Sequence, residues 1–252
     1  MKSSNPALGS KAFEQYQTGI QTAEAMTING TVNKTLILLV LLAVSAAWVW
    51  NRLTGSGIIG EDGVQQASLV YWIYGPMIVG FIVAMVTVFK QNWAPFTAPI
   101  YAVVEGVLLG SLSAVLESIY SGIVFQAVAL TIGTLFAMLV AYRMGVIKVT
   151  NKFRMGVMSA AIGIILVYII SFVVSLFGVD IGFLYSGIIG ILFSLFIVVI
   201  AALFLVLDFD LIDQGVMHGA PKFMEWYGAF ALILTLIWLY ISFLRLLSIL
   251  RQ

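Results

Sequence analysis

Long apolar runs, separated by short polar segments, make up most of the chain after about residue 32. There are seven such runs, at about residues 35–50, 68–89, 97–116, 122–142, 155–177, 183–207 and 226–250. A bilayer core of ~30 Å is crossed by a helix of about 20 residues, because each residue rises about 1.5 Å. The pattern therefore predicts an all-α fold, a bundle of seven transmembrane helices.

The polar segments between the runs are too short to hold a soluble domain, and they carry turn residues. Residues 54–57 and 61–63, between the first two runs, are rich in Gly, Ser and acidic residues. Short connections make consecutive helices antiparallel neighbours. We expect an amino-terminal tail at residues 1–32 and a seven-span transmembrane domain at residues 33–252.

Composition supports a lipid environment and excludes several classes of protein. The chain is 62% hydrophobic and 9% charged, whereas soluble domains carry about 25% charged residues. A net charge of +1 with no basic stripe gives nucleic-acid binding no electrostatic basis. Cysteine is absent and His218 is the single histidine, which excludes disulfides and sites built from several histidines or thiolates. No complete set of catalytic groups can be assembled, so we do not expect an enzyme.

The positive charges fall unevenly on the two sides of the membrane that alternating spans define. If the amino terminus lies on the first side, nine Lys and Arg residues fall there, and three fall on the other, Arg52, Arg245 and Arg251. Cytoplasmic loops are enriched in Lys and Arg, so this asymmetry predicts a cytoplasmic amino terminus. Seven spans then place the carboxyl terminus outside. The two last arginines argue against that placement, and a re-entrant or shallow seventh segment would return them to the cytoplasm.

Glycines within the spans indicate where helices approach closely, because helix association in lipid depends on small residues. Gly106 and Gly110 form a small-xxx-small pair in the third span. Three further pairs are expected to act in the same way, Gly75 with Gly80, Gly156 with Gly163, and Gly187 with Gly190. We interpret all of them as packing contacts.

Glu105 is an ionisable residue inside an apolar run, eight residues into the third span and so about 12 Å below its start. No basic residue stands three or four positions away, so any partner must come from another helix or from water. Ionisable groups in spans are costly to bury and are functional hypotheses by default. Two interpretations stay open: a protonated acid bonded to a neighbouring helix, or part of a polar pathway.

Three aspartates gather at the end of the sixth span, Asp208, Asp210 and Asp213. If the helix continues through them, about 100° per residue places Asp210 and Asp213 on one face and Asp208 roughly opposite. The three cannot then line one cavity. A solvated helix end is the alternative, but acids near a helix carboxyl terminus oppose the macrodipole and need compensating partners. The spacing does not match an EF-hand loop.

Three stretches of the chain resemble the Bax inhibitor (transmembrane Bax-inhibitor-motif) family, in its bacterial branch. They are Met-Thr-Ile-Asn-Gly-Thr-Val-Asn-Lys-Thr at residues 26–35, Pro-Ile-Tyr-Ala-Val-Val-Glu-Gly-Val-Leu-Leu-Gly at 99–110, and Asp-Phe-Asp-Leu-Ile at 208–212 followed by Trp-Leu-Tyr-Ile-Ser-Phe-Leu-Arg-Leu-Leu at 238–247. The resemblance implies a bundle whose central, strongly apolar span is wrapped by the others. It also implies a pH-sensitive calcium leak and, for a bacterial member, location in the inner membrane.

In the calcium-leak members of that family, an aspartate ending the sixth span pairs with one in the seventh, and protonation of the pair switches the channel. Asp208 matches the first aspartate, and the second falls at about Ser242, which cannot ionise. Two interpretations of this difference stay open. Asp208 pairs with Glu105, or with Asp213 through water, as a coupled carboxylate pair; or the switch is lost and only the scaffold remains.

The leading hypothesis is a bundle with a narrow polar path for calcium or protons. Asp208 and Glu105 would act as gate or calcium ligands, and Asp210 and Asp213 as a cytoplasmic acidic vestibule, because hard cations take oxygen ligands. The expected partners are the lipid bilayer and cations, and no cofactor is expected beyond a permeant or bound calcium ion. The rival hypothesis is a non-conducting regulatory partner of another membrane protein, such as a membrane protease.

Overall fold

A computed structural model of the chain describes residues 25–56, 58–60, 63–64, 66–177 and 186–252. Within these residues a short hairpin of β1 (Ile59–Gly60) and β2 (Gly63–Val64) joins the first two helices, and the turn η2 (Gln91–Trp93) precedes the third. The long helices are α2 (Ile28–Gly55), α3 (Gln66–Phe89), α4 (Ala94–Ile119), α5 (Ile123–Arg143), α6 (Asn151–Leu176), α7 (Gly187–Met217) and α8 (Met224–Leu250).

Seven helices in the described residues are long and apolar enough to cross a membrane, which confirms the predicted all-α bundle. Two of them extend far beyond the apolar runs. The first helix begins at Ile28 rather than near residue 35, because the Thr27 hydroxyl caps it by accepting the Gly30 amide at 3.0 Å. The sixth continues from the expected end at residue 207 to Met217.

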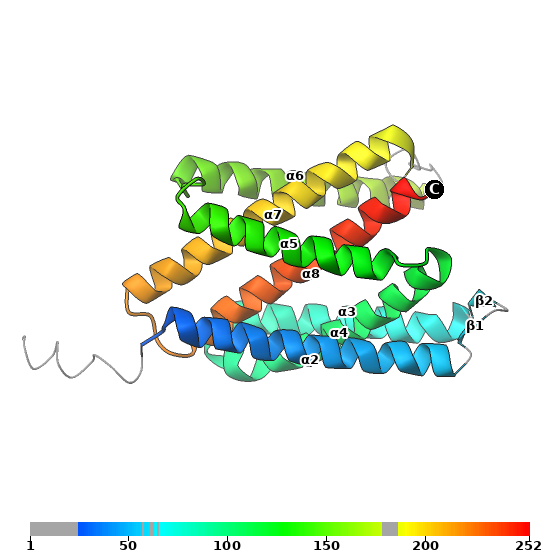
Figure 1. Cartoon of the computed structure of the whole chain (residues 1–252), viewed down its shortest axis with the longest axis horizontal. Helices are drawn as coiled ribbons and strands as arrows, with labels where there is room; N and C mark the ends of the chain where they lie inside the picture. Colours follow the sequence, from blue (N-terminus) through cyan, green and yellow to red (C-terminus); the bar gives the residue numbers. More distant parts are fainter. Residues whose placement is uncertain (1–24, 57, 61–62, 65, 178–185) are drawn as a thin grey trace, which may run out of the picture.

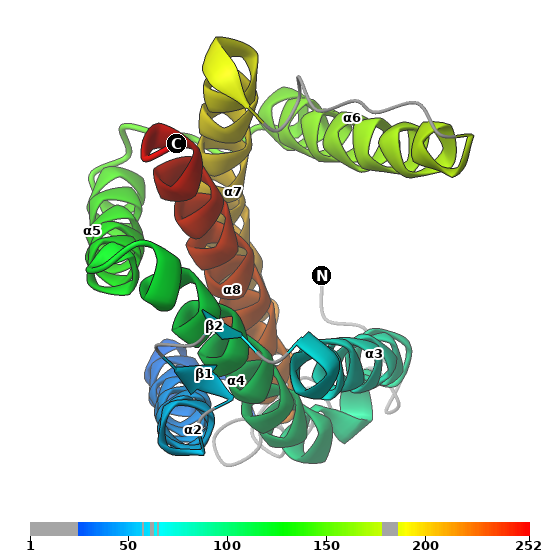
Figure 2. The same cartoon turned by 90° about the vertical axis from the view of Figure 1, so that its right-hand side faces the viewer.

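Helix α8 lies at the centre of the bundle (Figures 1 and 2). It packs against α7, α2, α5 and α4, and 56% of its apolar stretch is buried, against 11% for the peripheral helix α3. It is therefore the wrapped central span that the resemblance implied. The most apolar of the seven long helices in the described residues is its neighbour α7.

The seventh segment is one continuous helix rather than a re-entrant one. Helix α8 is unbroken over 27 residues, a length of about 40 Å. The two arginines at its carboxyl end are bonded to α6, to α5 and to the turn between α4 and α5. Arg245 bonds the Tyr168 hydroxyl, and Arg251 donates to the Ser121 carbonyl at 2.8 Å and to Gln126 at 2.9 Å.

Close packing of α4 on α2 depends on the glycines of the third span. A Cβ atom at Gly110 would lie 2.8 Å from the Cα atom of Ala46 in α2, and one at Gly106 would overlap the same helix. This pair therefore packs as predicted. The expectation is wrong for four other glycines, where an added Cβ atom would meet nothing within 4 Å: Gly75, Gly156, Gly163 and Gly187.

Candidate functional site

Asp208 is buried where α7 packs against α8. Its side chain is 9% exposed, and its Oδ2 atom has no hydrogen-bond partner among the described residues. Thr235 of α8 is its polar neighbour. A buried polar atom without a partner costs about 1–3 kcal/mol, and an ionised carboxylate without a counter-charge costs more. The closed packing seen here therefore suits a neutral Asp208, and ionisation would draw water or a cation to it.

Asp210 and Asp213 point away from Asp208, as the helical spacing predicted. Arg154 of α6 forms an ion pair with the Oδ2 atom of Asp210 at 2.7 Å, and Gln214 donates to the same atom at 2.7 Å. The Tyr142 hydroxyl of α5 donates to Asp213 at 2.8 Å. These are the compensating partners that acids near the end of a helix require. The three aspartates thus face three different helices and line no common cavity.

Glu105 is buried between α4 and α3 with 7% of its surface exposed. Its carboxylate lies against Gly80, where a Cβ atom would come within 2.5 Å of the Oε1 atom, and Tyr101 is a polar neighbour one turn earlier on α4. The structure does not bring Glu105 to Asp208, because the first faces α3 and the second faces α8. Among the described residues no group of three or more acids or histidines could hold a metal. A calcium-binding role for Asp208 and Glu105 stays a prediction.

The α8 residue opposite Asp208 differs from the one that the resemblance indicated. Ser242 is buried, but its hydroxyl donates to the Trp238 carbonyl of its own helix at 2.7 Å. Thr235, about two turns earlier, faces Asp208 instead. A threonine hydroxyl can donate to a carboxylate or accept from a carboxylic acid, so this contact can exist in either protonation state of Asp208.

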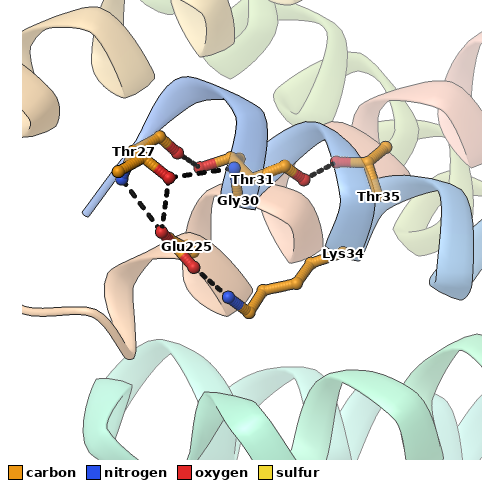
Figure 3. Close-up of polar contacts among 6 residues, drawn as sticks. All are labelled: Thr27, Gly30, Thr31, Lys34, Thr35 and Glu225. Atoms are coloured by element: carbon orange, nitrogen blue, oxygen red, sulfur yellow. Dashed lines mark hydrogen bonds and ion pairs between the residues drawn. The ribbon is translucent and has the colours of Figure 1, made fainter. Parts of the chain in front are cut away.

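A second polar site, which sequence reasoning missed, joins the first turns of α2 and α8 (Figure 3). Glu225 is 1% exposed, and its Oε1 atom accepts the amide and the hydroxyl of Thr27, both at 2.9 Å. Its Oε2 atom forms an ion pair with Lys34, whose ammonium group lies 5.6 Å from the centre of the Trp226 ring. Every charge in this cluster is paired, so we interpret it as a clamp that fixes the central helix to α2.

The residues of the clamp explain the motif at residues 26–35. A Cβ atom at Gly30 would overlap the Glu225 carboxylate, so only glycine leaves room for it. The Thr31 hydroxyl donates to the Thr27 carbonyl, and the Thr35 hydroxyl donates to the Thr31 carbonyl, each at 2.9 Å (Figure 3). Glu225 was not identified from the sequence as a site residue, because it stands directly before the expected start of the seventh span at residue 226. The available signal was that Lys34 and Glu225 carry opposite charges at span ends on the same side of the membrane.

Comparison with known proteins rests on one match. The model of the family described as Bax inhibitor 1 like matches residues 5–252, nearly the whole chain. Searches among curated proteins and among solved structures gave no match. The matched range includes the clamp, the glycines that pack α4 on α2, and Asp208 at the centre of the bundle. The chain therefore belongs to the Bax inhibitor 1 like family of membrane proteins with seven apolar helices.

Proposed function

We propose that this protein is a pH-responsive cation leak, with calcium or protons as the permeant ion and Asp208 as the gate. The observation that supports it is the buried carboxyl group of Asp208, at the interface between α7 and the central helix α8, with one oxygen that has no partner among the described residues. Polar and ionisable groups are kept inside a bundle at a cost, and in membrane proteins they mark ion paths. Every charged group in the clamp has a partner, whereas one oxygen of the Asp208 carboxyl group has none among the described residues.

The gate works through the cost of burying charge. A neutral Asp208 is compatible with the dry contact between α7 and α8, so acidic conditions keep the path closed. Loss of the proton leaves an anion in an apolar interface, where hydration or a bound cation lowers its free energy. The two helices separate enough to admit water, and the leak rises with pH.

The acids nearer the end of α7 contribute unequally to the path. Asp210 is neutralised by Arg154 at 2.7 Å, so it adds little attraction for cations. Asp213 accepts from the Tyr142 hydroxyl at 2.8 Å and has no ion pair among the described residues. We therefore assign the vestibule to Asp213. It lies five residues beyond Asp208, about 8 Å along the helix axis.

The proposed orientation follows from the distribution of Lys and Arg. The start of α2, the clamp and the carboxyl end of α7 lie on one side, which we place in the cytoplasm because alternating spans give that side nine of the twelve Lys and Arg residues. Asp213 then faces the cytoplasm. For a bacterial member, the membrane is the inner membrane.

The test is calcium uptake into liposomes that contain the purified protein and a calcium-sensitive dye. We expect uptake above that of empty liposomes in mildly alkaline buffer and a lower rate in mildly acidic buffer. Proton and potassium fluxes measured in the same vesicles identify the permeant ion. Uptake equal to that of empty liposomes at every pH, for all three ions, would exclude conduction and favour the non-conducting regulatory partner.

A further inference from the structure

A cavity of about 560 Å³ lies between α2 and α5, and α4 and α8 form its floor. In Figure 2, α5 lies above α2 at the left of the bundle, and α4 and α8 run beside them. The lining runs from Leu39 to Asn51 on α2 and from Val124 to Leu135 on α5. We call this cavity the lateral groove. It is open on the side of the bundle where lipid lies.

The groove has the length of one leaflet of the bilayer. Leu39 to Asn51 corresponds to about 18 Å of helix, and half of a ~30 Å hydrocarbon core is about 15 Å. Leu39 stands near the middle of α2 (Ile28–Gly55), and Asn51 stands in its last turns. The groove therefore runs from the bilayer centre to the surface at the carboxyl end of α2.

The wall of the groove offers hydrocarbon rather than polar contacts. Its buried hydroxyls already have partners inside the protein. Ser113 and Tyr240 share a hydrogen bond of 2.7 Å, and Thr131 donates to the Ala127 carbonyl at 2.7 Å. An occupant along the wall is consequently apolar over most of its length.

The mouth of the groove is polar. Trp50 and Asn51 line it, and the exposed Arg52 follows in the last turn of α2. Tryptophan is typical of the membrane interface, and arginine is suited to phosphate recognition. The wall of the groove is apolar, and its mouth is cationic at the height of the lipid headgroups. An amphipathic molecule with a phosphate group matches this arrangement.

The size of the groove suits a single lipid chain. A hydrocarbon chain is about 4 Å across, the contact distance between carbon atoms, whereas a helix with side chains is about 10–12 Å across. A helix of that width and about 18 Å long would fill about 1,400 Å³ or more, over twice the volume of the groove, about 560 Å³. The groove therefore holds the chain and is too small for the helix.

We propose that the lateral groove binds one phospholipid, with an acyl chain along α2 and α5 and the phosphate beside Asn51 and Arg52. This site is separate from the cation path, and its test does not depend on conduction. A lipid chain in the groove would contact four helices, α2, α4, α5 and α8.

The experiment is native mass spectrometry of the full chain in detergent, after delipidation and titration with palmitoyl-oleoyl phosphatidylglycerol. We expect one bound phospholipid per chain. The double variant Ala43→Phe/Ala47→Phe fills the groove from exposed positions on its α2 wall and should weaken binding by at least about tenfold. Ala129→Phe makes the same change at an exposed position of α5 outside the groove, and binding should equal that of the wild type.

Arg52→Gln tests the phosphate end separately, and we expect weaker binding without a change in stoichiometry. Thermal unfolding of each variant checks that it is folded. Several results would overturn the proposal: no adduct on the wild-type chain, an adduct with the mass of a fatty acid, a dimer in place of a lipid adduct, or binding that the groove-filling variant leaves unchanged.

Discussion

The clamp between α2 and α8 offers a stability test whose magnitude follows from the structure. Lys34→Met removes the ammonium group but keeps a side chain of similar length over Trp226. The Glu225 carboxylate, 1% exposed, then keeps only its two bonds from Thr27. Removing one partner of a buried ion pair costs about 3–5 kcal/mol. Because the Lys34 side chain is 15% exposed and water can reach the site, we expect the lower end, about 3 kcal/mol.

The assay is thermal unfolding of the purified protein in detergent. For a chain of this size, 1 kcal/mol corresponds to about 2–4 °C in Tm, taking the unfolding entropy of globular domains. Lys34→Met should therefore lower Tm by about 6–12 °C. Lys152→Met makes the same change at an exposed position of α6 and should change the stability by less than about 0.5 kcal/mol.

A double-mutant cycle separates the ion pair from other effects of the substitution. Glu225→Gln removes the charge that Lys34 neutralises, so the double variant should be more stable than the sum of the two single effects predicts. The expected coupling is about 1–3 kcal/mol. A loss in Lys34→Met no larger than that in Lys152→Met, or a coupling of zero, would refute the interpretation of the cluster as a clamp.

Three further substitutions probe other contacts, each by the same unfolding assay. Gly110→Ala places a Cβ atom against the backbone of α2 and should cost about 1–3 kcal/mol; Gly133→Ala, where a Cβ meets nothing within 4 Å, is the control, and equal losses would contradict the packing role. Arg154→Gln should cost less than about 1 kcal/mol, because the Arg154 side chain is 43% exposed; a large loss would mean that the pair is effectively buried. Glu117→Ala removes the acceptor of two amides at the start of α5, bonded at 2.5 Å and 3.1 Å, and should cost about 1 kcal/mol; an unchanged Tm would show that water replaces this cap.

The number of spans could be predicted from the sequence because length and hydropathy alone determine it. The ends of the helices could not. Helix α2 starts at Ile28 because Thr27 caps it, although the polar residues there lower the apolar signal. Helix α7 reaches Met217 because Arg154 and Tyr142, on two other helices, stabilise its aspartates. Those partners are distant in the sequence and no local pattern reveals them.

The candidate site could be predicted only in part, again because contacts between distant parts of the sequence leave no local pattern. Periodicity separated Asp208 from Asp210 and Asp213 correctly, since all three lie on one helix. The neighbours of each acid depend on tertiary packing. Glu105 faces Gly80 instead of Asp208, and Asp208 faces Thr235 instead of Ser242.

The clamp illustrates the limit most clearly. Thr27 and Glu225 are 198 positions apart in the chain. Their contact follows only once α8 is known to lie at the centre of the bundle, beside the start of α2.

The most direct test of the gate compares calcium uptake by liposomes containing wild-type protein, Asp208→Asn or Asp210→Asn, in acidic and alkaline buffer. Asparagine has nearly the shape of aspartic acid and cannot ionise, so Asp208→Asn should stay at the low acidic rate in both buffers. Wild type and Asp210→Asn should both conduct faster in alkaline buffer, because Asp210 is already neutralised by Arg154. Equal uptake by wild type and Asp208→Asn at every pH would contradict the assignment of Asp208 as the gate.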